Sequence, residues 1–329
     1  MTAPTVFTPR PDQDQRRAIS PILAPFGGIT YLADAGEDPD ARATMLNAAR
    51  AIITLSPRRE LSQHDLSALA GAEFIQLLSA GANHIDFAAL PPQAKVAGNV
   101  GAYADPMAEH VVAMALALAK RLPQNHAKLA SGVFDHFETL RLRGGTAGIL
   151  GYGGIGKASA RLFRAFGMRI HAINSSGRGD ENADLTGTLA DLGDLLASSD
   201  IVVVSLPLTR ATRGLIGARE LSLMKPEAIL INVARGAILD EDALYEHLRA
   251  HPEFCAGIDT WWDEPRDGKP FHPGHPFFTL PNLLGSPHNS GTVAGIDAEA
   301  AATAARNVAA YLSGAPVRGI QDPADYQPT

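Results

Sequence analysis

Residues 146–163 read TAGILGYGGIGKASARLF, and this stretch decides the fold. Its early residues, AGIL, are a short apolar run typical of a buried strand. Three glycines follow at once, and the next residues continue as a helical pattern that ends at Gly167. A strand, a glycine turn and a helix in this order are the context in which G-x-G-x-x-G binds a dinucleotide. Because N–H groups at the start of such a helix can approach a pyrophosphate, we expect cofactor contacts from Gly151, Gly153, Gly154, Ile155 and Gly156.

Composition and charge restrict the class of protein. A chain of 329 residues is long enough for two domains. Hydrophobic residues make up 46% and charged residues 19%, which is typical of a globular protein. The net charge is −7 and no run of Lys or Arg is present, so we expect no nucleic-acid partner.

Cysteine usage and apolar segments indicate the compartment. Cys255 is the only cysteine and lies in the apolar stretch PEFCAGID, so we expect a buried, inert thiol and a reducing environment. The N-terminal stretch MTAPTVFTPRPDQDQRR has no apolar core of a signal peptide. The apolar helical stretch MAEHVVAMALALAK is too short to span a bilayer and contains Glu109 and His110. We therefore expect a cytoplasmic protein without a membrane partner.

Strand-like runs alternate with helical segments along most of the chain. ARAIITL, AEFIQLLSAG and AKVAGNVG lie before residue 102, and RIHAI, SDIVVVSLP, EAILINVA, FCAGID and NLLGS follow the glycine turn. This alternation predicts parallel sheets in an α/β fold with two doubly wound domains. We expect a Rossmann dinucleotide-binding domain over 102–291, inserted into a flavodoxin-like substrate domain made of 1–101 and 292–329. The first 25 residues match no motif.

Two long helices are expected at the domain junctions. Asp105 is a candidate N-cap, with Pro106 at the first helical position, for a helix that reaches Lys120 and Arg121. An alanine-rich helix near the C-terminus should stop at Gly314 and pack on the first domain.

The residues after RIHAI predict the type of dinucleotide. An NAD enzyme normally offers Asp or Glu to the ribose about 20 residues past the glycines, but this chain has Asn174 there. Hydroxyl groups and a guanidinium can bind a 2′-phosphate instead, so we expect contacts from Asn174, Ser175, Ser176 and Arg178 and a preference for NADP(H). In the alternative, NSSGRGDEN is a solvated loop, Asp180 or Glu181 binds the ribose, and NAD(H) is used.

Four further motifs follow in order: LPLTRATRGLIG, MKPEAILINVARG, GIDTWWDEP and LLGSPHNSG. With them the chain resembles the D-isomer-specific 2-hydroxyacid dehydrogenase family, in particular its glyoxylate and hydroxypyruvate reductases, from about residue 70 to 313. The resemblance implies a catalytic set of Arg235, Glu264 and His288. It also implies that SAGANHID (residues 79–86) is the loop for the substrate carboxylate, with Ala80 and Gly81 in contact, and that the chain forms a homodimer.

The chemistry of these residue types suits reduction of a 2-keto acid. Arg235 could hold the carboxylate and polarise the carbonyl, while His288 could protonate the developing alkoxide. Glu264 would favour the protonated imidazole. Each could instead have a structural role: a salt-bridging Arg, a loop carboxylate and a hydrogen-bonded loop His. The dinucleotide supplies the hydride, so we expect no metal.

Other residues are expected around the cofactor. Asp259 resembles the family residue that binds the nicotinamide amide, although it could simply cap the end of a strand. The backbone of Leu206, Pro207, Val233 and Ala234 is expected to line the cofactor cleft, because ligands lie beyond the carboxyl ends of parallel strands. His272 and His275 could suggest a metal pair, but the surrounding prolines favour a packed loop.

Departures from the family pattern bear on the substrate. Trp261 and Trp262 replace smaller or single aromatic residues, and could lie in the core, at an interface or in the pocket; Asn289 follows the predicted acid. Ala80 disfavours phosphite and Glu264 disfavours formate. The favoured function is reduction of a small 2-keto acid such as glyoxylate or hydroxypyruvate. The alternatives are oxidation of a sugar acid and a dinucleotide-sensing, co-repressor-like scaffold, the latter disfavoured because no long tail is present.

Overall fold

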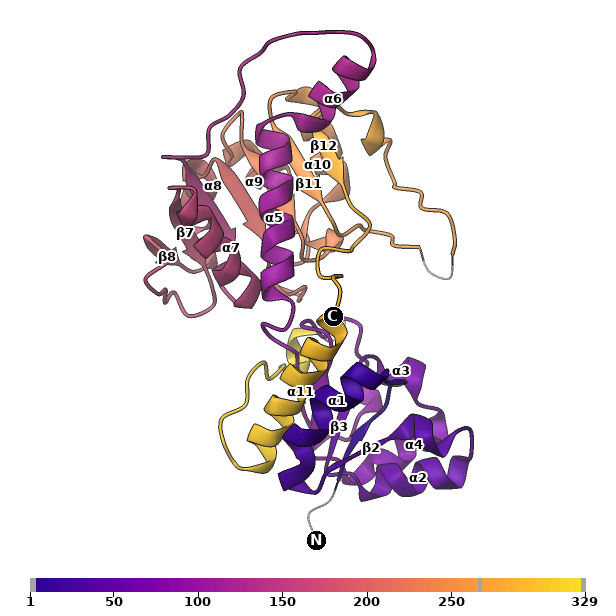
Figure 1. The fold of residues 1–329 in the computed structure, drawn as a ribbon. Helices are drawn as coiled ribbons and strands as arrows, with labels where there is room; N and C mark the ends of the chain where they lie inside the picture. Colours follow the sequence, from indigo (N-terminus) through magenta and orange to yellow (C-terminus); the bar gives the residue numbers. More distant parts are fainter. Residues whose placement is uncertain (1–3, 266–267, 327–329) are drawn as a thin grey trace. The chain divides into compact units, whose positions relative to one another are not determined.

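The computed structural model describes residues 4–265 and 268–326, which form two compact units (Figure 1). Unit 1 contains the residues up to Tyr103 together with those from Val293 onward, and unit 2 is Ala104–Thr292. The middle of the chain is therefore one continuous unit, and the two ends of the chain share the other.

Unit 1 is built on a parallel sheet that has five strands within the described residues, in the order β2-β1-β3-β4-β5. This is the strand order of flavodoxin-like folds. Residues such as Val6, Ile52 and Ile75 occupy matched register positions and are fully buried, so the strands read as continuous apolar runs. The strands are β1 (Thr5–Phe7), β2 (Ile29–Tyr31), β3 (Ala51–Thr54), β4 (Phe74–Leu77) and β5 (Lys95–Ala97).

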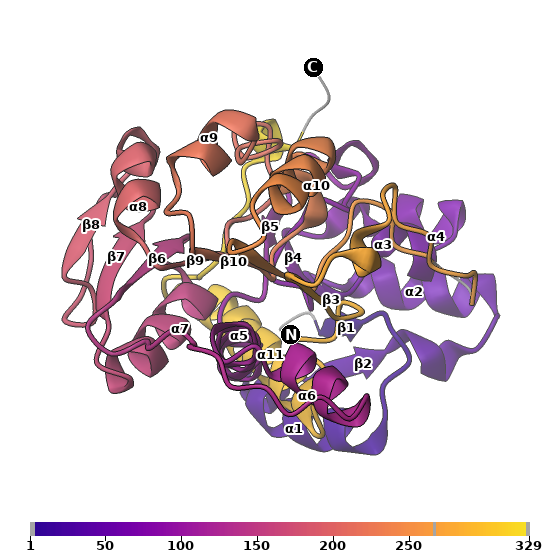
Figure 2. The same cartoon turned by 90° about the horizontal axis from the view of Figure 1, so that it is seen from above.

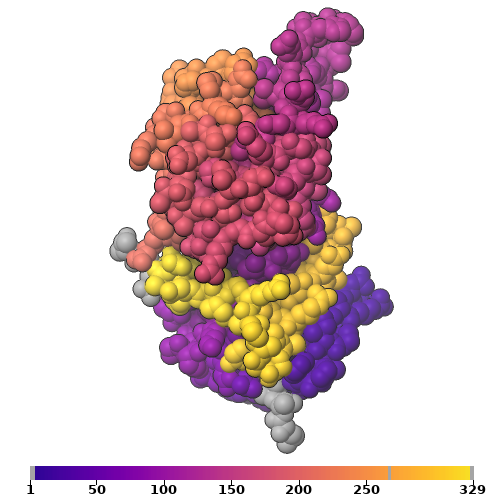
Figure 3. Space-filling view, turned by 90° about the vertical axis from the view of Figure 1, so that its left-hand side faces the viewer, coloured from indigo at the N-terminus to yellow at the C-terminus, as the bar shows by residue number. Residues whose placement is uncertain are grey.

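Helices cover the sheet of unit 1. They are α1 (Gln13–Leu23), α2 (Pro39–Ala48), α3 (Pro57–Glu60), α4 (Gln63–Ala68) and α11 (Ile296–Leu312). The C-terminal α11 lies beside α1 (Figure 1), and Ile19 of α1 shares an apolar cluster with Ala301 and Val308. After α11 the chain turns at Gly314, whose φ is +75°, as a C-terminal glycine cap requires. The last described residues then lie across the surface of unit 1 (yellow in Figure 3), with a bridge between Ile320 and Ala97.

Unit 2 contains a parallel sheet with seven strands among the described residues, in the order β12-β11-β10-β9-β6-β7-β8. Counted from β6, the order 3-2-1-4-5-6 of a Rossmann fold is present, with β12 added at the edge. The predicted fold class is therefore confirmed. The strands are β6 (Thr146–Leu150), β7 (Arg169–Ile173), β8 (Leu185–Gly187), β9 (Ile201–Val204), β10 (Ile229–Asn232), β11 (Cys255–Ile258) and β12 (Leu283–Gly285).

The helices of unit 2 lie on both faces of its sheet. They are α5 (Ala104–Ala119), α6 (Leu122–Ala130), α7 (Gly154–Ala165), α8 (Leu192–Ser198), α9 (Ala218–Leu223) and α10 (Glu241–Ala250). Figure 2 shows α5 and α7 on one face and α9 and α10 on the other. Each face has its own apolar cluster, one with Val111 and Phe163 and one with Leu221 and Leu244. In Figures 1 and 3, α6 and the residues after it project from the body of this unit.

The long apolar helix α5 differs from expectation at its start. It begins at Ala104, so Asp105 lies inside the first turn and is not the N-cap. At this position its negative charge interacts favourably with the dipole of α5. The Asp105 carboxylate also accepts a hydrogen bond from Arg161 of α7 at 2.9 Å. No helix in residues 4–265 and 268–326 combines the length and the apolar composition needed to cross a bilayer.

Candidate active site

The residues predicted to bind cofactor or substrate in unit 2 follow the carboxyl ends of its strands. Because all the strands are parallel, these ends meet at one edge of the sheet, where ligands of such folds bind. The residues that follow the successive strands are Gly151 after β6, Asn174 after β7, Leu206 and Pro207 beyond β9, Val233, Ala234 and Arg235 after β10, Asp259 after β11, and His288 beyond β12. The fold thus gathers residues that are up to 137 positions apart in the chain onto one edge.

The three glycines of the turn after β6 differ in what an added side chain would meet. Gly151 has a φ of +100°, and a Cβ there would lie 2.6 Å from the carbonyl oxygen of Ser205. A Cβ at Gly156 would overlap the carbonyl oxygen of Gly151 and lie 2.9 Å from Cγ2 of Ile149, so this glycine allows helix α7 to pack on β6. Gly153 has open space within 4 Å of its Cβ position.

This glycine turn fits a pyrophosphate. Helix α7 begins at Gly154, and the first N–H groups of a helix have no partner inside the helix. Among the described residues, the N–H groups of Gly154 and Ile155 have no hydrogen-bond acceptor, and the space around the Cβ position of Gly153 is open. The helix dipole further favours an anion at this position.

The loop after β7 is organised by Asn174. Its side-chain amide donates to the carbonyl oxygen of Arg178 at 2.7 Å, and its Oδ1 accepts from the backbone N–H and the hydroxyl of Ser176 at 3.0 Å each. Gly177 has a φ of +64°, which closes the turn. Ser175, Ser176 and Arg178 are exposed, and within the described part of the chain the Arg178 guanidinium has no ion pair. We call residues 174–178 the phosphate loop, after the 2′-phosphate that the sequence predicts to bind there.

Asp180, the alternative partner for the ribose, is already engaged. Its carboxylate accepts a hydrogen bond from the Tyr152 hydroxyl at 2.6 Å and pairs with Lys157 Nζ at 3.0 Å. The hydrogen bond from Tyr152, together with those from Lys157 and the Asn182 N–H, lowers the pKa of Asp180 to about 2. Asp180 is therefore ionised at neutral pH, and its charge is neutralised locally.

Arg235 is presented by a loop that Asn232 holds. The fully buried Asn232 accepts from the N–H of Ala234 at 3.0 Å and donates to the carbonyl oxygen of Arg235 at 2.9 Å. Arg235 donates from Nη1 to the carbonyl oxygen of Ala234 at 2.6 Å. A Cβ at Gly236 would overlap the backbone of Trp261, so this glycine allows the Arg235 loop to lie against the segment that carries Glu264.

His288 and Glu264 form a hydrogen-bonded pair. Nδ1 of His288 lies 2.8 Å from Oε2 of Glu264, and the other carboxylate oxygen accepts from the N–H of Trp261 at 3.0 Å. Burial alone would raise the pKa of Glu264, but the hydrogen bonds from His288 and Trp261 and the charge of Arg235 lower it below its usual value. An ionised Glu264 can only accept, so Nδ1 carries the hydrogen and Nε2 is left for a ligand.

Asp259 holds the loop that carries His288. It is fully buried, and it accepts from the Ser286 hydroxyl at 2.6 Å and from the N–H groups of Asn289 at 3.1 Å and Ser290 at 3.2 Å. Burial raises the pKa of Asp259, but these hydrogen bonds lower it overall. His288 itself has a φ of +51°, a conformation that costs energy for a residue with a side chain. The hydrogen bonds are those of a strand-end cap, and a contact of Asp259 with nicotinamide stays a prediction.

Several of these supporting residues were not predicted from the sequence. They are Asn232, Ser286 and His110, whose Nε2 lies 3.0 Å from the Ser286 hydroxyl. Since that hydroxyl donates to Asp259, His110 must donate to it. A polar residue at the end of a buried strand, as in LINVARG, is the available signal for Asn232; the contact between His110 and Ser286 spans 176 residues and has none.

The two tryptophans belong to the core of unit 2. Trp261 is 7% exposed and donates from Nε1 to the carbonyl oxygen of Ser286 at 2.9 Å, and Trp262 donates to the carbonyl oxygen of Leu239 at 2.7 Å. Trp262 also stacks on Phe277. Both indole N–H groups are used inside the fold, and the side chain of Asn289 is exposed beside His288.

Two other sequence features have structural roles. Cys255 is buried and burial raises the pKa of its thiol. His275 stacks on Tyr245 and its Nε2 lies 2.7 Å from Asp242, whereas His272 is exposed. In the part of the chain that the structure describes, no group of three or more His, Cys, Asp or Glu side chains is arranged to hold a metal ion.

Ala80 and Gly81 lie in unit 1, in the loop after β4. The hydroxyl of Ser79 donates to the carbonyl oxygen of Gly81 at 2.9 Å, and the N–H of Asn99 donates to the carbonyl oxygen of Ser79 at 2.8 Å. Among the described residues, the N–H groups of Ala80 and Gly81 have no hydrogen-bond partner. They are therefore available to an anionic ligand.

A model of the D-isomer specific 2-hydroxyacid dehydrogenase NAD-binding domain matches residues 112–290, which is more than half of the chain. The chain belongs to this family. The matched residues include the glycine turn, Arg235, Glu264 and His288.

Similar proteins within this family differ in name and length. The chain is 36% identical to a glyoxylate reductase of Aeropyrum pernix over 228 residues, 67% of each chain. It is 29% identical to a D-3-phosphoglycerate dehydrogenase of Archaeoglobus fulgidus over 280 residues, 84% of this chain but only 52% of that relative, so it spans about half of that protein. A solved 2-hydroxyacid dehydrogenase from Xanthobacter autotrophicus, in complex with NADPH and MES, has a TM-score of 0.79 at 25% identity, covering 98% of this chain and 99% of that one.

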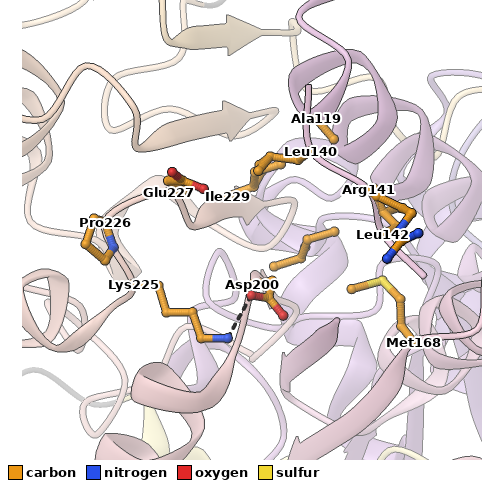
Figure 4. A pocket seen from close by; sticks show the side chains of 11 residues that line it. Ala119, Leu140, Arg141, Leu142, Met168, Asp200, Lys225, Pro226, Glu227 and Ile229 are labelled. Carbon is orange, nitrogen blue, oxygen red and sulfur yellow. Dashed lines mark hydrogen bonds and ion pairs between the residues drawn. The ribbon is translucent and has the colours of Figure 1, made fainter. Parts of the chain in front are cut away.

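A cavity of about 340 Å³ lies in unit 2 at the amino ends of strands β9 and β10 (Figure 4). It is lined by Ile201 and Ile229, the first residues of β9 and β10, and by Leu140 and Met168. Lys225 and Asp200 in its wall pair with each other at 2.7 Å. Because the cavity lies at the amino ends of the strands, it is separate from the candidate active site at their carboxyl ends.

Proposed function

We propose that this chain is an NADPH-dependent reductase of small 2-keto acids of the glyoxylate or hydroxypyruvate type, and that it forms D-2-hydroxy acids. The observation that carries the proposal is the His288–Glu264 pair of 2.8 Å, with Arg235 close enough to lower the pKa of Glu264, at the ligand-binding edge of a Rossmann sheet. A proton donor, its orienting carboxylate and a fixed cation are the groups that carbonyl reduction needs.

In the proposed mechanism, Arg235 binds the carboxylate of the keto acid and polarises the carbonyl to be reduced. A contact of Ala80 and Gly81 with the substrate carboxylate stays a prediction. The bound dinucleotide supplies the hydride. Nε2 of His288 gives its proton to the carbonyl oxygen as that oxygen becomes an alkoxide, while Glu264, bound to Nδ1, orients the ring and stabilises its protonated form.

The phosphate loop supports the choice of NADPH. Arg178 is exposed and without an ion pair among the described residues, so its guanidinium can bind a 2′-phosphate with charge-assisted hydrogen bonds. Ser175 and Ser176 add hydroxyl groups to the same loop. Asp180, which would favour NADH, is engaged with Tyr152 and Lys157.

Arg178→Ala tests the role of the phosphate loop. We expect the Kd of NADPH to rise about 10- to 100-fold, because charge-assisted hydrogen bonds are lost, and the Kd of NADH to change by less than about twofold. Arg143, an exposed cation just before β6, is a matched control whose replacement by Ala should leave both values unchanged. An equal loss for the two cofactors would contradict a specific role of Arg178.

A small substrate is proposed because the feature that suggested a larger one lies in the core. Sugar-acid oxidation was expected to use Asn289 and the two tryptophans to contact extra hydroxyl groups, but both indole N–H groups are bonded inside unit 2, which leaves only Asn289 exposed for such contacts. We further propose that the protein is a cytoplasmic homodimer. Leu129, which is 57% exposed on α6, and Phe134, which is 81% exposed in the residues that follow, support an interface between subunits there. Light scattering of the purified protein would measure whether its mass is that of a dimer.

The first experiment is a parallel assay of NADPH and NADH oxidation with glyoxylate, hydroxypyruvate and larger 2-keto acids. Fast oxidation of NADPH with a small keto acid is the expected result. A preference for NADH would reject the cofactor part of the proposal alone. If no keto acid reacts with either cofactor, the reductase proposal is wrong.

A further inference from the structure

Asp180 lies two residues after Arg178, yet both of its carboxylate oxygens are bound by other parts of unit 2. Oδ1 accepts from the Tyr152 hydroxyl at 2.6 Å and from the N–H of Asn182 at 3.1 Å. Oδ2 pairs with Lys157 Nζ at 3.0 Å, and the Asp180 side chain is 26% exposed. The carboxylate is thus turned toward helix α7 and is not free in the loop.

The two partners of Asp180 come from the glycine turn itself. Tyr152 lies between Gly151 and Gly153, and it is only 3% exposed. Lys157 directly follows Gly156, and its Nζ lies 5.5 Å from the centre of the Tyr152 ring. Burial, reinforced by the hydrogen bond to Asp180, raises the pKa of the Tyr152 hydroxyl, so this group keeps its hydrogen and stays a donor. The turn that receives the pyrophosphate is therefore tied to the end of the phosphate loop.

A free carboxylate in the loop that follows β7 would have a direct effect on cofactor choice if it reached the ribose. When free, it accepts a hydrogen bond from a ribose 2′-hydroxyl and repels a 2′-phosphate, and both effects favour NADH. We propose that Tyr152 and Lys157 hold Asp180 away from the ribose and thereby shift the ratio of the two cofactor affinities toward NADPH; we call these three side chains the acid latch. The inference rests on the proposed function, because it assumes that the phosphate loop receives the ribose end of the cofactor.

A four-protein cycle tests the acid latch: wild type, Tyr152→Phe, Asp180→Asn and the double variant. Isothermal calorimetry gives the Kd of NADPH and of NADH for each protein, and the ratio of the two is the quantity compared. Tyr152→Phe removes one of the two hydrogen bonds to Oδ1 and weakens the hold on the carboxylate, so we expect the preference for NADPH to fall by about fivefold, as one partly screened charge would cause. In the Asp180→Asn background the same change should leave the ratio unaltered, because no charge remains to be released.

Two further variants control the test. Lys157→Met removes the other partner and should shift the ratio in the same direction, again only when Asp180 is present. Glu227→Gln removes an exposed acid beside the cavity at the amino ends of the strands of unit 2, and should leave the ratio at the wild-type value. If circular dichroism shows that Tyr152→Phe melts at a lower temperature than the wild type, the change in cofactor preference is measured with Lys157→Met instead.

The outcomes separate the acid latch from the proposed function. The acid latch is overturned if Tyr152→Phe and Lys157→Met weaken both cofactors equally, or if their effects persist in the Asp180→Asn background. A wild-type preference for NADH overturns the cofactor part of the proposed function. It does not decide on the acid latch, because the latch is judged by comparing each effect with and without the Asp180→Asn change, whichever cofactor the wild type prefers.

Discussion

Glu264 is the residue whose removal tests the candidate site most directly. Its carboxylate binds Nδ1 of His288 and the N–H of Trp261, and its lowered pKa keeps it ionised at neutral pH. Glu264→Gln retains the shape but removes the charge that stabilises a protonated imidazole. We expect kcat for keto acid reduction to fall about a hundredfold, because the Nδ1–H of His288 loses its charged acceptor.

A stability measurement distinguishes the proposed role of Glu264 from a structural one. Asp263, the neighbouring acid in the sequence, is a matched control, and Asp263→Asn should keep both the wild-type rate and the wild-type stability. If Glu264→Gln lowered the rate only together with the free energy of unfolding, Glu264 would only support the loop. An unchanged rate would remove Glu264 from the catalytic set.

The motif residues could be located from the sequence, but the residues that hold them could not. Each of Arg235, Glu264 and His288 lies in a short local pattern that can be read from neighbouring letters. Asn232 bonds to residues two and three positions further on, so its signal is local, whereas the hydrogen bonds of Ser286 with Asp259 and His110 depend on how segments far apart in the chain meet. A contact across 176 residues leaves no local signal.

Helix α7 and its glycine turn can be tested by two alanine substitutions with opposite expectations. Gly153→Ala adds a methyl group in open space, so the free energy of unfolding should change little while dinucleotide binding weakens. Gly156→Ala forces the methyl group onto the backbone of Gly151, so we expect a loss of about 1–3 kcal/mol in stability as well. Urea unfolding and calorimetry measure the two effects. Equal stability losses would contradict the different roles of the two glycines.

Helices α2 and α4 are joined by a nearly buried ion pair. Asp65 is 1% exposed, accepts from Arg42 Nη2 at 2.7 Å, and closes the capping box of α4 with Ser62. Burial raises the pKa of Asp65, but the hydrogen bonds from Arg42 and Ser62 lower it overall. Asp65→Asn leaves Arg42 without its counter-charge, so we expect a loss of about 3 kcal/mol at pH 7.

The pH dependence of this loss has a definite sign. A carboxylate with a lowered pKa in the folded state stabilises the protein fully above its unfolded value, and that contribution disappears as the pH falls through the folded value. The difference in urea stability between wild type and Asp65→Asn should therefore shrink as the pH is lowered from neutral through the ordinary range of a carboxyl group. A difference that is constant with pH would mean that Asp65 acts through shape alone.

Sequence patterns predicted some elements better than others. The strand β6, the glycine turn and helix α7 follow from one stretch, and the end of the C-terminal helix follows from Gly314. The first 25 residues matched no motif because β1 has three residues and α1 is polar and contains Pro21. The capping box of Asp12 and Gln15 was the signal available there.

Only unit 2 is expected to be stabilised by the dinucleotide. The residues expected to bind it lie in unit 2, and each unit has its own apolar clusters. NADPH at about 100 times its Kd should stabilise unit 2 by about 2.7 kcal/mol. Hydrogen exchange should therefore slow in β9 and β10 of unit 2, and stay unchanged in β3 and β4 of unit 1. Equal protection of both pairs of strands would contradict binding through unit 2 alone.

The phosphate loop has a consequence for protein engineering. Its turn is closed from within, by bonds between Asn174, Ser176 and Arg178, and its serine and arginine side chains are exposed. Replacing these few residues therefore disturbs neither apolar cluster of unit 2. We therefore expect most variants in a library confined to residues 174–178 to fold, so that the library can be screened for altered cofactor preference. This loop can then be exchanged while the rest of unit 2 stays unchanged.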